Sequence, residues 1–427
     1  MTQPSDKSKL IRVLIADDSS IMRAALSRMI ESDRELQIVG YAVDGVDVLE
    51  QTKALDPDVV TLDIEMPRMN GLEALSRIMA ESPRRVIMLS SLTREGAKST
   101  FDALERGAFD FIPKPGAEAA HGIFDIREDL VAKIKNAAHA PWTQAGPPSR
   151  KASARAVPNL SAQVQAAPAI VAIGTSTGGP KAVQEVLSQL PAHLPTGILI
   201  VQHMPVGFTA QFADRLNHLC RLAVREAKGE ETIDPGTVYI APAGIHMTVN
   251  RVGAQYRTQL SKSPAGTLHT PSVDVLMHSV ARAYGSHAMG IILTGMGADG
   301  AQGMKAIRDA GGWTIGQDAE SCAVYGMPRS AAEINALSRI APLSQIAAEI
   351  MAALTQRANT ATVSTSARSA RETVPTSELA QRCRNRVSCG SMRILRVPDG
   401  TRRRNAVSRP SAKIRPSNTG GCPGISA

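Results

Sequence analysis

The sequence predicts an α/β protein of two domains: a five-stranded parallel sheet, then a second doubly wound, mostly parallel sheet with an antiparallel hairpin region. Short apolar runs alternate with amphipathic segments over residues 10–138 and again over 169–355. A stretch rich in Ala, Pro and Ser, residues 139–168, separates them and is typical of a flexible linker. A length of 427 residues with 43% hydrophobic residues suits two cores of this kind.

The first predicted domain consists of five strand–helix repeats. The predicted strands are 12–16, 36–42, 58–63, 85–90 and 109–112, and the predicted helices are 19–31, 45–54, 71–80, 96–106 and 122–138. Repeats of this kind give parallel strands with helices on both faces of the sheet.

Chemically active side chains fall at the ends of these strands. Asp17 and Asp18 follow the first strand, Asp63 ends the third, Ser90 ends the fourth and Lys114 follows the fifth. Any one of the Asp residues alone is more simply a solvated loop residue or a helix cap. Together, converging carboxylates favour a Mg²⁺ site, and the neighbouring ammonium suits phosphoryl transfer to a carboxylate.

These segments resemble a response-regulator receiver domain of the flavodoxin-like fold. The resemblance rests on DD at 17–18, LDIEMPRMNG around Asp63, Ser90, and KP at 114–115. It implies that Asp63 accepts a phosphoryl group from a histidine kinase and that Asp17, Asp18 and Asp63 hold Mg²⁺. It also implies that Ser90 and Lys114 form the receiver switch.

The second predicted domain, residues 169–355, begins with the run AIVAIGTSTGGPK. Its predicted strands are 169–173, 197–203, 222–227, 288–293 and 313–316, and its predicted helices are 181–190, 208–220, 272–284, 303–310 and 325–335. Residues 236–262 alternate between apolar and polar side chains, which favours antiparallel hairpins.

Ser176 occupies the middle of a Gly174-x-Ser176-x-Gly178 turn between the first strand and helix. This spacing is the nucleophile-elbow pattern, and free N–H groups at the helix start suit a developing oxyanion. A phosphate-binding loop does not fit, because Pro180 stands where that loop needs Lys. A Gly-rich turn with a purely structural role remains an equal alternative on this stretch alone.

Ser176, His203 and Asp299 all lie at the ends of predicted strands. A serine needs a base, and an imidazole oriented by a carboxylate supplies one. His246 and His269 are rival bases, and Asp299 alone is more simply the cap of a helix from residue 300. The order Ser, His, Asp and the position of the serine on the first strand argue against an α/β-hydrolase.

Six motifs in this region resemble the chemotaxis protein-glutamate methylesterases, the CheB family. They are GTSTGGP at 174–180, VQHMP at 201–205, YIAP at 239–242, PSVDVL at 271–276, LTGMGADG at 293–300 and YGMPRSA at 325–331. The resemblance implies that Ser176 is the nucleophile, His203 the base and Asp299 its orienting carboxylate, with Thr177 and Met296 near the oxyanion site.

The same resemblance implies hydrolysis of glutamyl methyl esters on cytoplasmic helices of chemoreceptors, with release of methanol and no cofactor at the esterase site. Some relatives also deamidate glutamine. The receiver would act as a lid that phosphorylation of Asp63 opens, so deletion of residues 1–168 should raise basal activity. A receiver that acts by binding alone, or a general serine esterase, are the alternative functions.

Charge and cysteine content bound the remaining possibilities. Residues 357–427 carry 14 Lys and Arg against 3 Asp and Glu, which predicts a disordered basic tail and leaves the rest of the chain slightly acidic. The five cysteines form no recognisable framework, and no run is apolar enough to span a membrane. We therefore expect a cytoplasmic monomer without nucleic-acid binding or membrane insertion.

Overall fold

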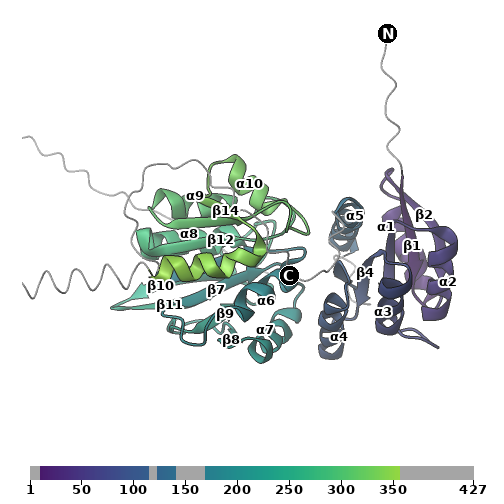
Figure 1. Ribbon diagram of the computed structural model, residues 1–427, viewed down its shortest axis with the longest axis horizontal. Helices are drawn as coiled ribbons and strands as arrows, with labels where there is room; N and C mark the ends of the chain where they lie inside the picture. The colour runs from purple at the N-terminus through teal and green to yellow at the C-terminus, as the bar shows by residue number, and fades with distance from the viewer. Residues whose placement is uncertain (1–9, 115–122, 141–168, 356–427) are drawn as a thin grey trace, which may run out of the picture. The chain divides into compact units, whose positions relative to one another are not determined.

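The computed structural model describes residues 10–114, 123–140 and 169–355 (Figure 1). All of them fall within one compact unit of the chain. Most of the predicted linker and all of the predicted tail, 356–427, lie outside the described residues.

The predicted five-stranded parallel sheet is confirmed. Its order is β2-β1-β3-β4-β5, with every pairing parallel. The strands are β1 (Ile11–Ala16), β2 (Leu36–Ala42), β3 (Val59–Asp63), β4 (Arg85–Ser90) and β5 (Asp110–Pro113). The helices are α1 (Ser20–Ile30), α2 (Gly45–Leu55), α3 (Gly71–Glu81), α4 (Arg94–Glu105) and α5 (Ile123–His139).

Alternating strand residues supply the two faces of this sheet. Val13 and Ile15 of β1 pack in one buried cluster with α1 and α5, whereas Leu14 and Ala16 pack in another with α2, α3 and α4. Polar side chains start the helices: Asp44, for example, accepts hydrogen bonds from the backbone N–H groups of the first turn of α2.

The second sheet has seven strands, and every pairing in it is parallel. Its order is β14-β13-β12-β6-β7-β9-β8. The strands are β6 (Ile170–Thr175), β7 (Gly197–Gln202), β8 (Ala223–Glu226), β9 (Thr237–Ile240), β12 (Ala288–Ile292), β13 (Trp313–Gln317) and β14 (Arg339–Ala341). The helices are α6 (Gly179–Ser188), α7 (Phe208–Leu219), α8 (Val273–Tyr284), η1 (Gly285–His287), α9 (Ala301–Asp309), α10 (Met327–Glu333) and a final helix, 343–355.

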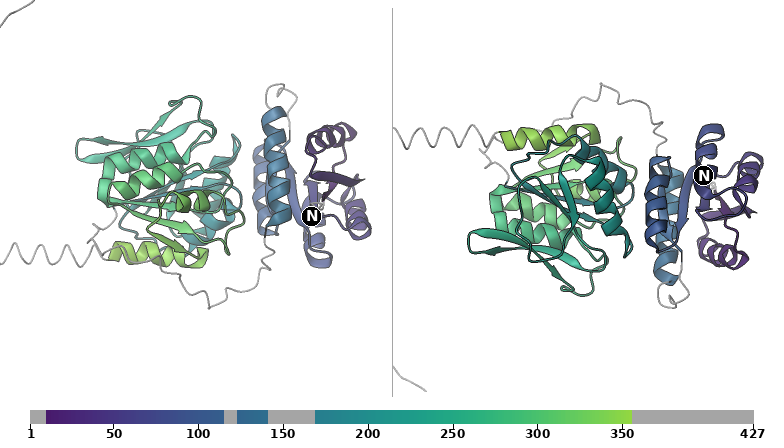
Figure 2. Two further views of the ribbon diagram at one scale, coloured as in Figure 1. Left: turned by 90° about the horizontal axis from the view of Figure 1, so that it is seen from above. Right: turned by 90° about the horizontal axis from the view of Figure 1, so that it is seen from below.

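One antiparallel hairpin forms in the region 236–262, and the remaining expected segment is parallel. β10 (His246–Val252) and β11 (Gln255–Ser261) form a two-stranded hairpin, which projects from one side of the domain in both views of Figure 2. The prediction was wrong for residues 236–242, because β9 is fully buried and pairs in parallel with β7 and β8. Burial on both faces explains its apolar sequence.

Helices cover both faces of the seven-stranded sheet. α6, α7 and the helix 343–355 contribute to one buried cluster, and α8, α9 and α10 contribute to the other. β14 and the helix 343–355 extend the fold beyond the last predicted element, and the helix is yellow-green in Figure 2.

The strand order positions the candidate site. β6 is the first strand of this sheet along the chain, yet it lies in the interior between β12 and β7. Strands that follow β6 are therefore added on both sides of it, and such a switch point in the strand order leaves a crevice at the carboxyl ends of neighbouring strands. Ser176, His203 and Asp299 follow β6, β7 and β12.

Candidate functional site

Ser176 lies in the tight turn between β6 and α6. Its N–H donates to the carbonyl oxygen of Thr294 at 3.1 Å, and Nε2 of Gln202 donates to the carbonyl oxygen of Ser176 at 2.9 Å. Gly178 has a φ of 76°, and a Cβ there would lie 2.5 Å from Cβ of Ala323. The turn therefore needs glycine, and it fixes the Ser176 backbone while the residue stays partly exposed.

His203 follows β7 and makes its ring hydrogen bond through Nε2. This nitrogen lies 2.8 Å from Oδ2 of Asp299. Because an ionised carboxylate only accepts hydrogen bonds, Nε2 carries the proton and Nδ1 keeps its lone pair. Nδ1 is buried and has no hydrogen-bond partner among the described residues. Nδ1 is thus the nitrogen available as a base.

Asp299 receives four hydrogen bonds at the N-terminus of α8. Oδ1 accepts from Ser272 Oγ at 2.8 Å and the N–H of Asp274 at 3.0 Å, while Oδ2 accepts from His203 and the N–H of Val273 at 2.7 Å. Burial acts to raise the pKa of Asp299, but His203 and the two N–H groups outweigh it and lower the pKa from 3.8 to about 2. The carboxylate is therefore ionised at neutral pH.

The alternative role of Asp299 as the cap of the following helix is wrong. α9 begins after Gly300, and no side chain caps it. Asp299 instead interacts with the first turn of α8, where Ser272 is the N-cap residue. The motif at 271–274 carried this signal, since a Ser cap followed by free N–H groups forms an anion site.

The two rival histidines occupy different places. His246 is buried, and its Nδ1 accepts from the N–H of Ser272 at 3.1 Å while its Nε2 lies 3.2 Å from Thr267 Oγ1. His269 stacks on the His203 ring. Burial first, and His203 second, lower the pKa of His269. Neither ring makes a hydrogen bond to Ser176 in the described part of the chain.

Thr177 follows Ser176 in the turn, and Met296 follows Gly295, where an added Cβ would lie 2.9 Å from Cβ of Ser176. The carbonyl oxygen of Thr177 accepts from Thr294 Oγ1 at 2.9 Å. Met296 lines a cavity of about 620 Å³ together with residues of the loops 296–298 and 319–326, and with Asn136 and His139 of α5. Asn136 Nδ2 donates to Met296 Sδ at 3.1 Å. The oxyanion roles stay predictions.

The predicted acidic cluster forms in the first domain. One ligand atom from each of Asp17, Asp18 and Asp63 lies within 4.8 Å of the others. Lys114 Nζ lies 2.6 Å from Asp63 Oδ2 and 3.1 Å from Asp17 Oδ2. Three carboxylates from adjacent strands β1 and β3 offer the hard oxygen ligands that Mg²⁺ prefers, so the donor set fits this ion.

Asp63 is almost fully buried beside this cluster. Burial, with a smaller contribution from the charge of Asp17, raises the pKa of Asp63 from 3.8 to about 6, although Lys114 opposes the shift. Burial therefore destabilises the ionised form of Asp63, and a bound cation would offset this destabilisation.

The hydrogen bonds of the Ser90 hydroxyl go to other partners than Asp63 among the described residues. Its Oγ donates to the carbonyl oxygen of Gly96 at 3.1 Å and accepts from Thr100 Oγ1 at 2.6 Å. Ser90 ends β4, the strand next to β3, so its backbone lies at the same edge of the sheet as Asp63. Its switch role stays a prediction.

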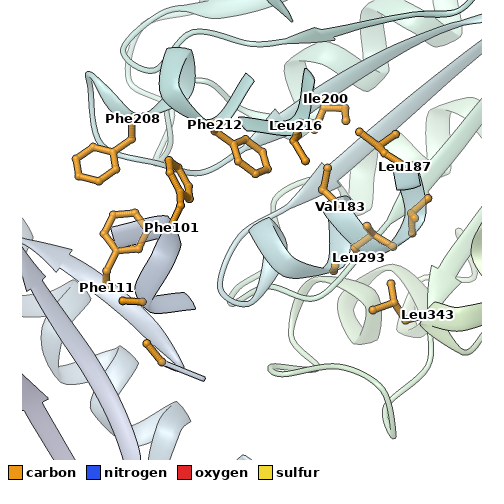
Figure 3. Packing of buried hydrophobic residues seen from close by; sticks show 14 of the residues in the cluster. Phe101, Phe111, Val183, Leu187, Ile200, Phe208, Phe212, Leu216, Leu293 and Leu343 are labelled. Carbon is orange, nitrogen blue, oxygen red and sulfur yellow. The ribbon is translucent and has the colours of Figure 1, made fainter. Parts of the chain in front are cut away.

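A cluster of phenylalanines that sequence reasoning missed joins β5 and α4 to α7 (Figure 3). Phe111 stacks on Phe208 with ring centroids 4.9 Å apart, and Phe101 stacks on Phe212 at 5.5 Å. Arg215 of α7 pairs with two acidic side chains of α4 beside this cluster.

Two family models match the chain, one on each side of the predicted linker. Residues 13–121 match the family described as response regulator receiver domain, and residues 171–350 match the family described as CheB methylesterase.

Curated relatives cover the same span. The protein-glutamate methylesterase/protein-glutamine glutaminase of Escherichia coli strain K12 is 44% identical over 342 residues, 80% of this chain and 96% of the relative. A protein of the same name, numbered 1, from Geobacter sulfurreducens is 43% identical over 357 residues, 81% of this chain and 98% of the relative. The crystal structure of the Thermotoga maritima CheB methylesterase catalytic domain is 38% identical, covers 43% of this chain and 97% of that chain, and has a TM-score of 0.42.

Proposed function

The chain belongs to the CheB methylesterase family, and we propose that it hydrolyses glutamyl methyl esters on chemoreceptor cytoplasmic helices under the control of phosphorylation at Asp63. The observation that carries the esterase proposal is the set of Ser176, His203 and Asp299 on three adjacent strands, with Nδ1 of His203 free to accept a proton. The names of the relatives supply the substrate class.

In the proposed reaction, Ser176 Oγ attacks the ester carbonyl carbon and its proton passes to Nδ1 of His203. Asp299 holds Nε2–H and stabilises the imidazolium that forms. The tetrahedral intermediate collapses when the C–O bond to the methoxy group breaks, and Nδ1–H gives its proton to methanol. A glutamyl ester of Ser176 remains.

Water then completes the cycle. Nδ1 of His203 takes a proton from water, the hydroxide attacks the acyl carbon, and the proton returns to Ser176 as the glutamate carboxyl group leaves. The same sequence on a glutamine side chain would release ammonia in place of methanol, and we include this deamidation in the proposal because both named relatives carry it.

The receiver half of the proposal assigns Asp63 as phospho-acceptor from a histidine kinase. An Asp63 carboxylate oxygen attacks the phosphorus of the kinase phosphohistidine, the P–N bond breaks and the kinase imidazole leaves, and Lys114 neutralises part of the charge on the product. Mg²⁺ held by Asp17, Asp18 and Asp63 would supply further charge neutralisation when bound. Ser90 would follow the phosphoryl group as the switch hydroxyl.

We propose that the receiver restrains access to Ser176 until Asp63 is phosphorylated. Support comes from Asn136 of α5, which contacts Met296 in the cavity beside the candidate oxyanion region. The phenylalanine cluster adds buried area to the same unphosphorylated arrangement. Phosphorylation would act by shifting the population away from this arrangement.

The deciding experiment measures methanol release from methylated chemoreceptor with and without a small phosphodonor. We expect stimulated release from the wild-type chain, none from Ser176→Ala, and unstimulated basal release from Asp63→Asn. If Ser176→Ala releases no methanol while Asp63 is still phosphorylated, the esterase site has been removed and the receiver still works, so the two parts of the proposal are tested separately. Stimulation that survives in Asp63→Asn would contradict the receiver assignment.

Two alternatives give different outcomes in this assay. A receiver that acts by binding alone would release no methanol from any chemoreceptor. A general serine esterase would hydrolyse small esters at a rate independent of the phosphodonor.

Among the described helices, none is long and apolar enough to span a membrane. We propose that the chain acts in the cytoplasm, since the proposed substrate helices lie there, and that it acts as a monomer.

A further inference from the structure

We propose that His269 is a positioning residue that fixes the ring plane of His203, and that a brace built on His246 holds it there. The inference rests on the proposed esterase function and concerns a side chain that the reaction scheme above does not use.

The first argument is the way in which His203 is held. Its ring has one hydrogen bond, from Nε2 to Asp299, because Nδ1 has no partner among the described residues. A single hydrogen bond fixes the position of Nε2 but leaves the ring able to turn about that contact. Nδ1 can receive the Ser176 proton only when the ring points it into the crevice, so another contact must set the ring plane.

His269 makes that contact. Its ring centroid lies 4.1 Å from the His203 centroid, with an angle of 28° between the planes. This stack covers one face of the His203 imidazole. Burial first, and the neighbouring His203 second, lower the pKa of His269, which favours a neutral ring that does not compete for the Asp299 carboxylate.

Hydrogen bonds to His246 hold the loop 267–272, which carries His269. Because Nδ1 of His246 accepts from the N–H of Ser272, its Nε2–H donates to Thr267 Oγ1. Thr267 Oγ1 in turn donates to the carbonyl oxygen of His269 at 3.0 Å. A buried imidazole thus fixes both ends of the short loop from Thr267 to Ser272.

The brace also reaches Asp299 through Ser272. The Ser272 N–H donates to His246, and its hydroxyl donates to Asp299 at 2.8 Å. Contacts therefore run from Asp299 through Ser272, His246 and the loop to His269, and return through the ring stack to His203. One face of the His203 ring and its Nε2 are therefore both held by the same connected set of contacts.

The test compares His269→Ala, which removes the stack, with His269→Phe, which keeps a flat ring. Leu268→Ala is the matched control, since it shortens the neighbouring side chain in the same loop, and Leu268 is 92% exposed. Methanol release from methylated chemoreceptor gives kcat and KM. The rate at which a fluorophosphonate labels Ser176 reports activation of the serine without a receptor substrate.

We expect His269→Ala to lower both kcat and the labelling rate about tenfold to hundredfold, with KM within about twofold of wild type. His269→Phe should recover kcat to within about threefold of wild type, and Leu268→Ala should match wild type. A kcat for His269→Ala within twofold of wild type would overturn the inference. So would a His269→Phe variant as slow as His269→Ala while phosphorylation of Asp63 and thermal unfolding remain normal.

The two readouts separate this inference from the proposed function. If the wild-type chain labels at Ser176 but releases no methanol, the substrate assignment fails and the labelling rates still test His269. If the wild type releases methanol and His269→Ala keeps its full labelling rate, the positioning role fails and the esterase function stands.

Discussion

Nη1 of Arg215 on α7 lies 2.9 Å from Oδ1 of Asp102 on α4, and Nη2 lies 2.5 Å from Oε1 of Glu105. One guanidinium thus joins two carboxylates one turn apart on a receiver helix. Arg215 is 19% exposed, so this ion pair is better shielded from solvent than a typical surface pair. The contact links the two halves of the chain beside the phenylalanine cluster.

Arg215→Ala should raise basal esterase activity. Each of its partly exposed ion pairs contributes up to about 1 kcal/mol, so their loss should weaken the restraining arrangement enough to raise basal methanol release about twofold to fivefold. The activity with the phosphodonor should change little. Arg221→Ala is the control, because Arg221 is exposed just beyond the end of α7. Unchanged basal release from a folded Arg215→Ala chain would contradict the restraint.

The stability of Asp63→Asn relative to wild type should depend on pH. The folded-state pKa of Asp63 is raised from 3.8 to about 6, so the folded state loses stability as pH rises through this interval. Asn carries no charge, and Lys114 keeps Asp17 as a partner. Without Mg²⁺, we therefore expect Asp63→Asn to be more stable at pH 7.5 by about 3 kcal/mol, with no such gain at pH 4.

Urea unfolding at the two pH values measures this difference. Mg²⁺ at about 100 times its dissociation constant should stabilise the wild type by about 2.7 kcal/mol and Asp63→Asn by clearly less. Asp214→Asn, in an exposed position, is the control for a lost surface charge. A stability gain for Asp63→Asn that persists at pH 4 would show that the Asp63 charge is not its cause.

Much of the fold could be predicted because strands buried on both faces leave long apolar runs. The ends of β1 and β3 carry Asp17 and Asp63, and parallel strands bring such ends together without further information. The direction of β9 could not be predicted, since a short buried strand pairs in parallel or antiparallel fashion according to its neighbours.

The sequence offers the Ser cap at 272 as an anion site, but it does not identify Asp299 as the anion. Its donors Ser272 and Val273 come from a helix start 26 or 27 residues earlier in the chain, and only the packing of α8 beside β6 brings them close. His269 likewise lies in a loop without periodicity, so nothing in its neighbours distinguishes a ring stacked on His203 from a surface residue.

Asp299→Asn should remove both catalysis and a source of stability. The amide keeps the shape but cannot hold Nε2–H of His203 as a carboxylate does, so kcat should fall by roughly 10³-fold to 10⁴-fold. Because the pKa of Asp299 is lowered to about 2, its ionised form stabilises the fold above pH 3.8, and this contribution is lost as pH falls towards 2.

The lost stability at pH 7 should be about 2 kcal/mol and should vanish near pH 2, which denaturant titrations of Asp299→Asn and wild type would measure. Asp309→Asn tests a carboxylate on the exposed side of α9, which pairs with Lys305, and should change neither kcat nor this pH dependence. Equal kcat values for Asp299→Asn and wild type would refute the orienting role. A destabilisation that stays constant from pH 7 to pH 2 would instead show that Asp299 acts through packing. An ionised carboxylate at the start of α8 must contribute more to the free energy of unfolding as the pH rises from 2 to 4, whereas packing contributes equally at both pH values.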